Sequence, residues 1–210
     1  MKFIFIIYLF MHINILRNIL CTAPINNGNS IRNIIIDNKM PTLYLKSKLN
    51  INEEVMRSVY SIEHILPRSY LDKSHYNDMH NIVKTINELN VMRGNYKYID
   101  EKVCNFTNKS QWRIAQQDNI VNHKERLFIP NKCSRGFISR ALLYMSYEYN
   151  YKLSNIIDID ILKKWYFKYP PNKKEMYHNT IVGNIQKKDN IFISKYDKKC
   201  KKINKYLESL

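Results

Sequence analysis

Two short β-prone segments lie close together in the middle of the chain. Residues 59–66 form a β-prone run that ends at Pro67, and residues 81–83 form a shorter one. The polar residues 71–77 between them are typical of a turn or loop. This pattern predicts two short strands separated by an irregular connection.

Helical patterns follow the second strand. Residues 85–93 are expected to form a short helix, with Thr85 as the N-cap, Glu88 three residues later in a capping box, and Gly94 after the last turn. Longer helices are expected over residues 135–153, 156–169 and 173–186. Short strands followed by helices indicate an α+β fold, a mostly helical single domain.

The chain is strongly basic, with 34 Lys and Arg against 18 Asp and Glu in 210 residues, a formal net charge of +16. This excess excludes an acidic disordered activator and makes an anionic partner the first hypothesis. A lysine-rich composition beside abundant Ile, Asn and Tyr is also what an AT-rich genome produces. The charge alone therefore does not decide whether the partner is a nucleic acid. Residues 61–130 carry ten basic and eight acidic side chains, and this nearly neutral part is where a cation site is expected.

The N-terminus has the pattern of a targeting segment. Lys2 precedes an apolar run over residues 3–10, which has the length of the hydrophobic region of a secretory signal. Because Pro24 would hinder cleavage after Ala23, a buried hydrophobic segment is the alternative. We therefore expect a signal or hydrophobic segment over residues 1–23, one domain over 24–194 and a lysine-rich, solvated tail over 195–210.

The residues suited to catalysis lie between residues 61 and 95. Hydrolysis of a phosphodiester needs a base for water, a cation for the charged phosphate and an acid for the leaving oxygen. His64 is the natural base, and Glu63 and Asn90 offer the hard oxygen ligands that suit Mg²⁺. An adjacent Glu-His pair is often incidental, and in a regular strand its two side chains point to opposite faces. A shared site therefore requires the strand to twist or end there, as Pro67 indicates.

Three motifs around these residues resemble the endonuclease I family, non-specific periplasmic and secreted nucleases with a ββα-metal (His-Me finger) site. They are Glu63-His64-Ile65-Leu66-Pro67-Arg68-Ser69, Asp78-Met79-His80-Asn81-Ile82 and Leu89-Asn90-Val91-Met92-Arg93-Gly94-Asn95. The likeness continues through residues 128–130 and 135–145 into a C-terminal block that ends near residue 193.

The resemblance implies a ββα-metal motif embedded in the helical domain, with the short strands and residues 85–93 as its ββα unit. It also implies that His64 is the general base and that Glu63 and Asn90 hold one Mg²⁺, for which Mn²⁺ or Ca²⁺ can substitute. The products would be 5′-phosphate and 3′-hydroxyl ends. The substrates would be DNA and RNA without sequence preference, because backbone contacts carry no base information. A monomeric, exported enzyme without stable membrane insertion is implied as well, with an intracellular or virion location as the alternative.

The chain departs from the family at the position of a phosphate-binding arginine. Many relatives carry this arginine in a longer insertion after the Glu-His motif, where residues 70–77 contain none here. Lys73 and Arg68 are the nearby candidates to replace it. Three residues after Glu175, His178 stands where many relatives have another arginine.

Four further residues are weaker candidates, each with a structural alternative. His80 could order the site or be a core histidine bonded to the backbone. Arg93 could approach the phosphate or cap the last carbonyls of its helix. Arg135 and Arg140 could contact phosphate or form structural ion pairs. The aromatic residues 165–167 are expected in the core rather than as a platform for bases.

Two other classes of function stay open at this point. One is a catalytically inactive basic protein that binds nucleic acid or has a structural role while retaining the fold. The other is a zinc enzyme using His64, His75 and His80, although these residues lack the spacing of a helical zinc-binding pair.

Overall fold

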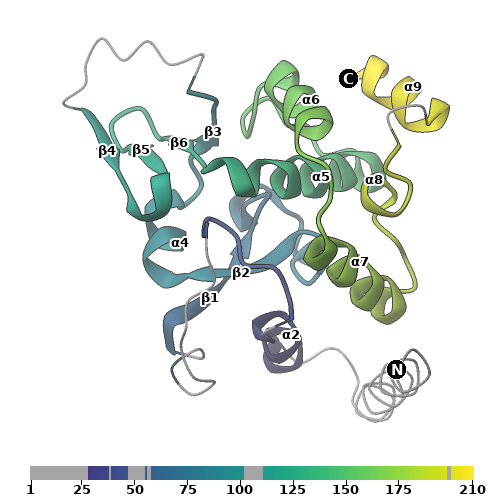
Figure 1. The fold of residues 1–210 in the computed structure, drawn as a ribbon, viewed down its shortest axis with the longest axis horizontal. Helices are drawn as coiled ribbons and strands as arrows, with labels where there is room; N and C mark the ends of the chain where they lie inside the picture. Colours follow the sequence, from purple (N-terminus) through teal and green to yellow (C-terminus); the bar gives the residue numbers. More distant parts are fainter. Residues whose placement is uncertain (1–27, 38, 47–54, 56–57, 102–110, 198–199) are drawn as a thin grey trace, which may run out of the picture. The chain divides into compact units, whose positions relative to one another are not determined.

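The computed structural model describes residues 28–37, 39–46, 55, 58–101, 111–197 and 200–210. The chain divides into two compact units, residues 1–34 and 35–210. In the first unit the described residues belong to helix α2 (Gly28–Ile36), which begins there (Figure 1). The expected signal segment, residues 1–23, lies outside the described residues. None of the helices in the described ranges is long and apolar enough to cross a membrane.

A two-stranded antiparallel hairpin contains the first two strands of the second unit. Strand β1 (Tyr60–His64) pairs with β2 (Ile82–Ile86), with Tyr60 opposite Ile86 and His64 opposite Ile82. Helix α4 (Asn87–Arg93) follows β2 directly and packs on both strands. The predicted order of two short strands and a short helix is therefore confirmed.

The predicted N-cap of the short helix is wrong. Strand β2 continues through Thr85, and α4 begins after Ile86. The Ile86 side chain forms no capping hydrogen bond with the helix. The Thr85 hydroxyl instead donates to the backbone oxygen of Leu43 at 2.9 Å. Thr85 therefore connects β2 to the segment before the hairpin. Gly94 does follow the helix, with a positive φ of 51° that favours glycine.

A second sheet lies between the hairpin unit and the long helices in sequence, and the sequence patterns did not indicate it. Its strands have the order β3 (Lys97–Tyr98), β6 (Leu127–Ile129), β5 (Ile120–Asn122) and β4 (Trp112–Ile114). The β3–β6 pair is parallel and the other two pairs are antiparallel. Strands of two or three residues are too short to show the alternation that identifies a strand.

Helix α5 (Lys132–Tyr149) carries much of the hydrophobic core. It begins three residues before the predicted position, with Asn131 accepting from the Ser134 amide, and ends where Asn150 adopts a left-handed conformation. Every residue from 134 to 146 is buried. The remaining helices are α6 (Ile159–Lys168), α7 (Lys173–Gln186) and α8 (Ile191–Ser194). Figure 1 shows α5 running between α6 and α7.

The burial of the aromatic residues 165–167 confirms part of the expected aromatic core. Trp165 and Tyr166 of α6 are buried, whereas Phe167 is only partly buried against the core.

The C-terminal segment differs from the solvated tail that was expected. Residues 201–209 form helix α9 (Lys201–Ser209), whose Ile203 and Leu207 are buried while its three lysines are exposed. Apolar side chains four residues apart lie on one face of a helix, so this segment packs on the core.

Candidate active site

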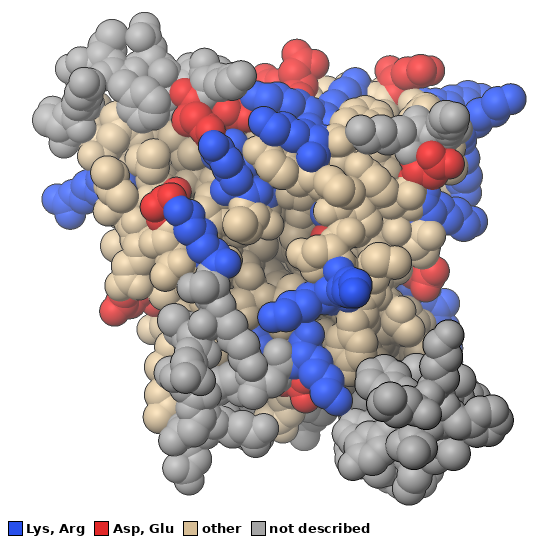
Figure 2. Space-filling model, viewed as in Figure 1, with Lys and Arg blue, Asp and Glu red and all other residues tan. Residues whose placement is uncertain are grey.

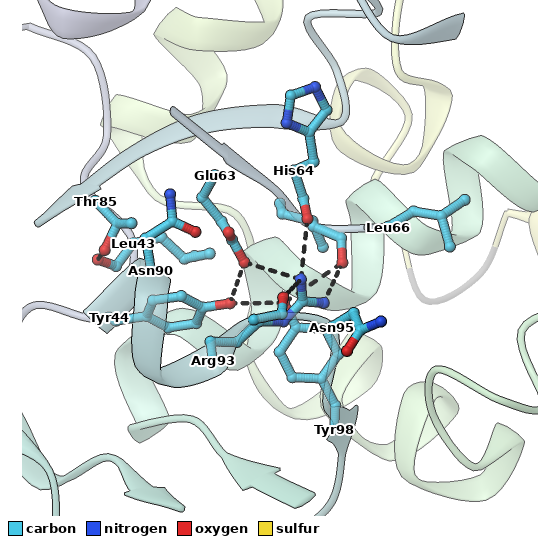
Figure 3. A network of polar contacts seen from close by, with 12 residues as sticks. Leu43, Tyr44, Glu63, His64, Leu66, Thr85, Asn90, Arg93, Asn95 and Tyr98 are labelled. Carbon is cyan, nitrogen blue, oxygen red and sulfur yellow. Dashed lines mark hydrogen bonds and ion pairs between the residues drawn. The ribbon is translucent and has the colours of Figure 1, made fainter. Parts of the chain in front are cut away.

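An open pocket of about 190 Å³ lies where β1 ends against α4. Its lining includes the three residues that the sequence pattern assigned to catalysis, Glu63, His64 and Asn90. The other lining residues are Ile62, Pro67, Arg68, Arg93 and Gly94. Figure 3 shows the site, with Glu63 and Asn90 beside each other and the His64 ring directed away from them.

The two neighbouring residues of β1 do point in opposite directions. Glu63 is buried, with 2% of its surface exposed, and His64 is partly buried on the other side of the strand. Both line the pocket because β1 ends at His64, so the pocket lies at the end of the strand rather than above one face. The chain turns away at Pro67, as the sequence indicated.

The Glu63 carboxylate is part of a buried polar network. Its Oε1 accepts a hydrogen bond from Tyr44 Oη at 2.8 Å and lies 3.2 Å from the Arg93 guanidinium. Burial raises the pKa of Glu63, and the Arg93 charge and the Tyr44 hydroxyl oppose that rise. Arg93 and Tyr44 therefore support the ionised form, which is the form that could bind a cation.

Tyr44 and Tyr98 complete this network and were not recognised in the sequence. Their hydroxyl oxygens are 2.6 Å apart, and Tyr44 is fully buried with a positive φ of 63°. Burial raises the pKa of both phenols, so both stay protonated and able to donate. The two tyrosines come from before β1 and from β3, and no local pattern connects either of them with Glu63.

The His64 ring is oriented by a backbone group. Its Nε2 lies 2.9 Å from the carbonyl oxygen of Tyr76. A carbonyl oxygen can only accept a hydrogen bond, so Nε2 carries the proton and Nδ1 keeps its lone pair. Burial lowers the pKa of His64, the hydrogen bond to Tyr76 opposes this, and the charges of Arg68 and Arg93 lower it further. The arrangement therefore favours a neutral imidazole with Nδ1 available as a base.

The Asn90 side chain is held with its oxygen available. Its Nδ2 donates to Ser61 Oγ and to the Ile62 carbonyl oxygen, both at 2.9 Å. Among the described residues no donor is bonded to Asn90 Oδ1. The pocket thus presents an amide oxygen beside the Glu63 carboxylate, a donor set that fits Mg²⁺, because this ion uses few protein ligands and keeps several waters.

The Arg93 guanidinium forms its hydrogen bonds inside the protein. Its NH1 donates to the carbonyl oxygens of His64 (3.1 Å) and Gly94 (3.0 Å), and its NH2 donates to that of Ile65 (2.6 Å). Its Cζ also lies 4.5 Å from the centre of the Tyr98 ring. Arg93 therefore connects the end of α4 to the end of β1, and the structure places it as a support of Glu63 rather than at an exposed phosphate position.

The structure places Arg135 and Arg140 in buried ion pairs, away from the pocket. Arg140 forms a bidentate pair with Glu175, with Nε–Oε1 at 2.6 Å and NH2–Oε2 at 2.7 Å. Arg135 contacts Glu101 and lies 3.8 Å from Asp100. Of the two alternatives that the sequence left open, the structure therefore shows the ion pairs, between buried arginines and acidic side chains of which Glu101 is partly exposed.

The histidines outside the pocket also have internal partners. His80 Nε2 lies 2.7 Å from the Lys188 carbonyl oxygen, and His178 Nε2 lies 3.1 Å from that of Met79. His75 Nδ1 lies 2.7 Å from Tyr151 Oη. Within the described ranges no three His, Cys, Asp or Glu side chains form a metal-binding cluster, so the zinc set of His64, His75 and His80 is not assembled.

Comparison with known proteins shows which family the chain belongs to. A sequence profile of the endonuclease I family matches residues 14–197. The chain is 35% identical over 119 residues to an extracellular deoxyribonuclease of Aeromonas hydrophila, covering 56% of this chain and 49% of that protein. It is 32% identical over 119 residues to a periplasmic deoxyribonuclease of the same species, covering 56% of this chain and 47% of that protein.

An endonuclease-1 of Buchnera aphidicola subsp. Baizongia pistaciae is 30% identical over 127 residues, covering 60% of this chain and 49% of that protein. The chain thus spans about half the length of the curated relatives it matches. The family match extends over most of the sequence and includes the hairpin, α4 and the pocket between them. The chain belongs to the endonuclease I family.

Proposed function

We propose that the protein is a metal-dependent endonuclease that hydrolyses phosphodiester bonds of DNA, and of RNA, to 5′-phosphate and 3′-hydroxyl ends. The observation that carries this proposal is the shared pocket of Glu63, His64 and Asn90 at the end of β1. Membership of the endonuclease I family supports it, and so do the printed functions of two relatives, an extracellular and a periplasmic deoxyribonuclease.

His64 is the general base in this proposal. Its Nε2 is committed to the Tyr76 carbonyl oxygen, so Nδ1 takes the proton from the attacking water. Burial keeps the imidazole neutral near neutral pH, because it lowers the pKa of His64. A base that is already neutral and already oriented needs no rearrangement before it accepts the proton.

Glu63 and Asn90 would hold one Mg²⁺, for which Mn²⁺ or Ca²⁺ can substitute. Such an ion, when bound, offsets negative charge on the phosphate and on the departing 3′ oxygen. Tyr44 and Arg93 keep the Glu63 carboxylate in place for that role. The Asn90 amide is oriented by its two donations to β1, so its oxygen faces the pocket.

The substrate is read through its backbone, without sequence preference. Figure 2 shows Lys and Arg side chains on the visible face in several separate groups, with acidic side chains close to some of them. Such a surface attracts a polyanion in a salt-dependent way and carries no base code. We also propose that the protein acts after export, as the names of the extracellular and periplasmic relatives suggest for those proteins.

A plasmid assay with purified protein tests the proposal. Supercoiled DNA should be nicked and then degraded with Mg²⁺, and EDTA or His64→Ala should abolish cleavage while DNA binding persists. His123→Ala is the matched control, since His123 is exposed and does not line the pocket. Intact plasmid with wild-type protein and Mg²⁺ would leave only the inactive, nucleic-acid-binding alternative.

A further inference from the structure

A cationic side chain that reaches a phosphate in the pocket would stabilise its negative charge in addition to the proposed metal ion. The three buried arginines are not placed to make this contact. Arg93, Arg135 and Arg140 are each at most 4% exposed, and their guanidinium groups are bonded to carbonyl oxygens or acidic side chains. The Nε of Arg93 has no partner among the described residues, but it is buried as well. A cationic side chain that meets a substrate phosphate in the pocket would therefore have to be another residue.

Arg68 lines the pocket together with Glu63, His64 and Asn90. It begins the single turn η1 (Arg68–Tyr70), immediately after Pro67, and its side chain is exposed. In the part of the chain that the structure describes, its guanidinium forms neither a hydrogen bond nor an ion pair. Its planar fork of five donors is thus available to an anion from solution.

Tyr76 positions the Arg68 guanidinium and the His64 imidazole at the same time. Arg68 Cζ lies 4.4 Å from the centre of the Tyr76 ring, a cation–π contact that limits where the guanidinium can lie. The backbone oxygen of Tyr76 accepts from His64 Nε2. One residue therefore sets the positions of both side chains relative to each other.

The segment that carries Tyr76 is anchored on the C-terminal end of α5 and the residues after it. The Asp72 amide donates to Tyr151 Oη at 2.8 Å. Asp78 accepts from Tyr149 Oη at 2.6 Å. Hydrogen bonds on both sides of Tyr76 thus hold the segment that its ring belongs to. Arg68 rests on that ring and so differs from an arginine that only extends into solvent.

We propose that Arg68 binds a non-bridging oxygen of the substrate phosphate in the pocket. The proposal rests on the nuclease function proposed above. A guanidinium placed beside the base and the two metal ligands offsets the charge that develops on the phosphate as water attacks. Its fork can bind two phosphate oxygens, which a lysine cannot do.

Steady-state kinetics on duplex DNA with Mg²⁺ test the catalytic part. Arg68→Ala should lower kcat by about 10²-fold, the effect of losing one donor to a developing negative charge. Arg68→Lys should recover part of this loss, since it keeps the charge without the fork. Arg113→Ala is the matched control, an exposed arginine on β4 that does not line the pocket, and it should stay within twofold of wild type.

Binding of a DNA duplex in EDTA supplies a second readout that needs no turnover. The logarithm of the association constant for DNA falls linearly with the logarithm of the salt concentration. The steepness of this fall should decrease by about one unit in Arg68→Ala and by less in Arg68→Lys, whose charge remains. Wild-type kcat or an unchanged salt slope in Arg68→Ala would overturn the proposal. Absence of cleavage by the wild type would refute the nuclease function instead, and the salt slope would still decide whether Arg68 meets a phosphate.

Discussion

Nε2 of His64 and the backbone carbonyl oxygen of Tyr76 lie 2.9 Å apart, although the residues are twelve positions apart in the chain. Because the acceptor belongs to the backbone, replacing the Tyr76 side chain does not by itself remove it. The orientation of the imidazole instead depends on where the segment between β1 and β2 is held. Asp78 is the buried acidic residue that anchors this segment.

We predict that Asp78→Asn destabilises the protein and lowers its turnover. Asp78 accepts from Tyr144 Oη (3.1 Å) and Tyr149 Oη (2.6 Å), and hydrogen bonds to a charged acceptor contribute about 1.5–3 kcal/mol. The free energy of unfolding from urea titration should fall by about that amount. The kcat of the folded variant should also fall, because the Tyr76 carbonyl oxygen is less well placed.

Asp160→Asn is the control for this substitution. Asp160 is exposed in the first turn of α6, so its replacement should change the unfolding free energy by about 0.5 kcal/mol or less. If Asp78→Asn were as stable and as active as Asp160→Asn, the anchoring role of Asp78 would be refuted.

Tyr44→Phe should weaken metal binding without unfolding the protein. The variant loses the hydroxyl that donates to Glu63 Oε1 but keeps the aromatic ring in the core. Loss of a partner that orients a metal ligand typically costs 10–100-fold in affinity. Calorimetric titration of Mg²⁺ into the His64→Ala background should therefore show a dissociation constant raised by about 10-fold or more.

The matched control for Tyr44→Phe is Tyr166→Phe. The Tyr166 hydroxyl is also buried, but no described residue pairs with it. Removing it should leave Mg²⁺ affinity unchanged and should not reduce stability. Equal Mg²⁺ affinities for the two variants would show that Tyr44 does not orient Glu63.

The sequence was informative where the chemistry depends on local order. The Glu63-His64 pair before Pro67 and the position of Asn90 in the short helix correctly led to one pocket. Thr85 was misassigned because a capping-box pattern also occurs where a strand continues for one more residue. Tyr44 and Tyr98 could not be found from local patterns, since they meet Glu63 only through tertiary packing. The role of the Tyr76 backbone oxygen has no signature in side chains at all.

Glu175→Gln should destabilise the protein strongly while leaving the kcat of the folded fraction unchanged. Arg140 and Glu175 are each 1% exposed, and breaking such a pair leaves an uncompensated buried charge. The cost is about 3–5 kcal/mol in comparable cases. Thermal unfolding measures the loss, and the rate per folded molecule tests whether this pair lies outside the catalytic machinery.

A double substitution separates the pair's charge from its packing. In Arg140→Met combined with Glu175→Leu neither charge is left unpaired, so this variant should be more stable than Glu175→Gln. A double variant less stable than the single one would mean that the other contacts of Arg140, including its donation to the Tyr169 carbonyl oxygen at 2.6 Å, contribute more than the charge pair.

His178 makes the stability of the protein sensitive to acid. It is buried on α7, stacks on Phe137, and faces His80 as the other titratable group. Burial first and the nearby His80 second lower the pKa of His178 from its ordinary value of 6.5 to about 3, and the hydrogen bond to Met79 opposes them. The unfolded chain therefore binds a proton below pH 6.5 that the folded protein does not bind.

This difference in proton binding gives the sign of the pH dependence. The contribution of His178 to stability is complete above pH 6.5 and is lost as the pH falls toward 3, at about 1.4 kcal/mol per pH unit. The pKa of His80 is lowered too, so the wild-type slope contains both histidines. Urea unfolding between pH 6 and 4 measures the slope of the unfolding free energy against pH. In His178→Gln this slope should decrease by the amount that corresponds to about one bound proton. The exposed control His123→Gln should keep the wild-type slope. An unchanged slope in His178→Gln would mean that His178 is protonated in the folded protein, and that its ring is not held neutral between Phe137 and the Met79 carbonyl oxygen.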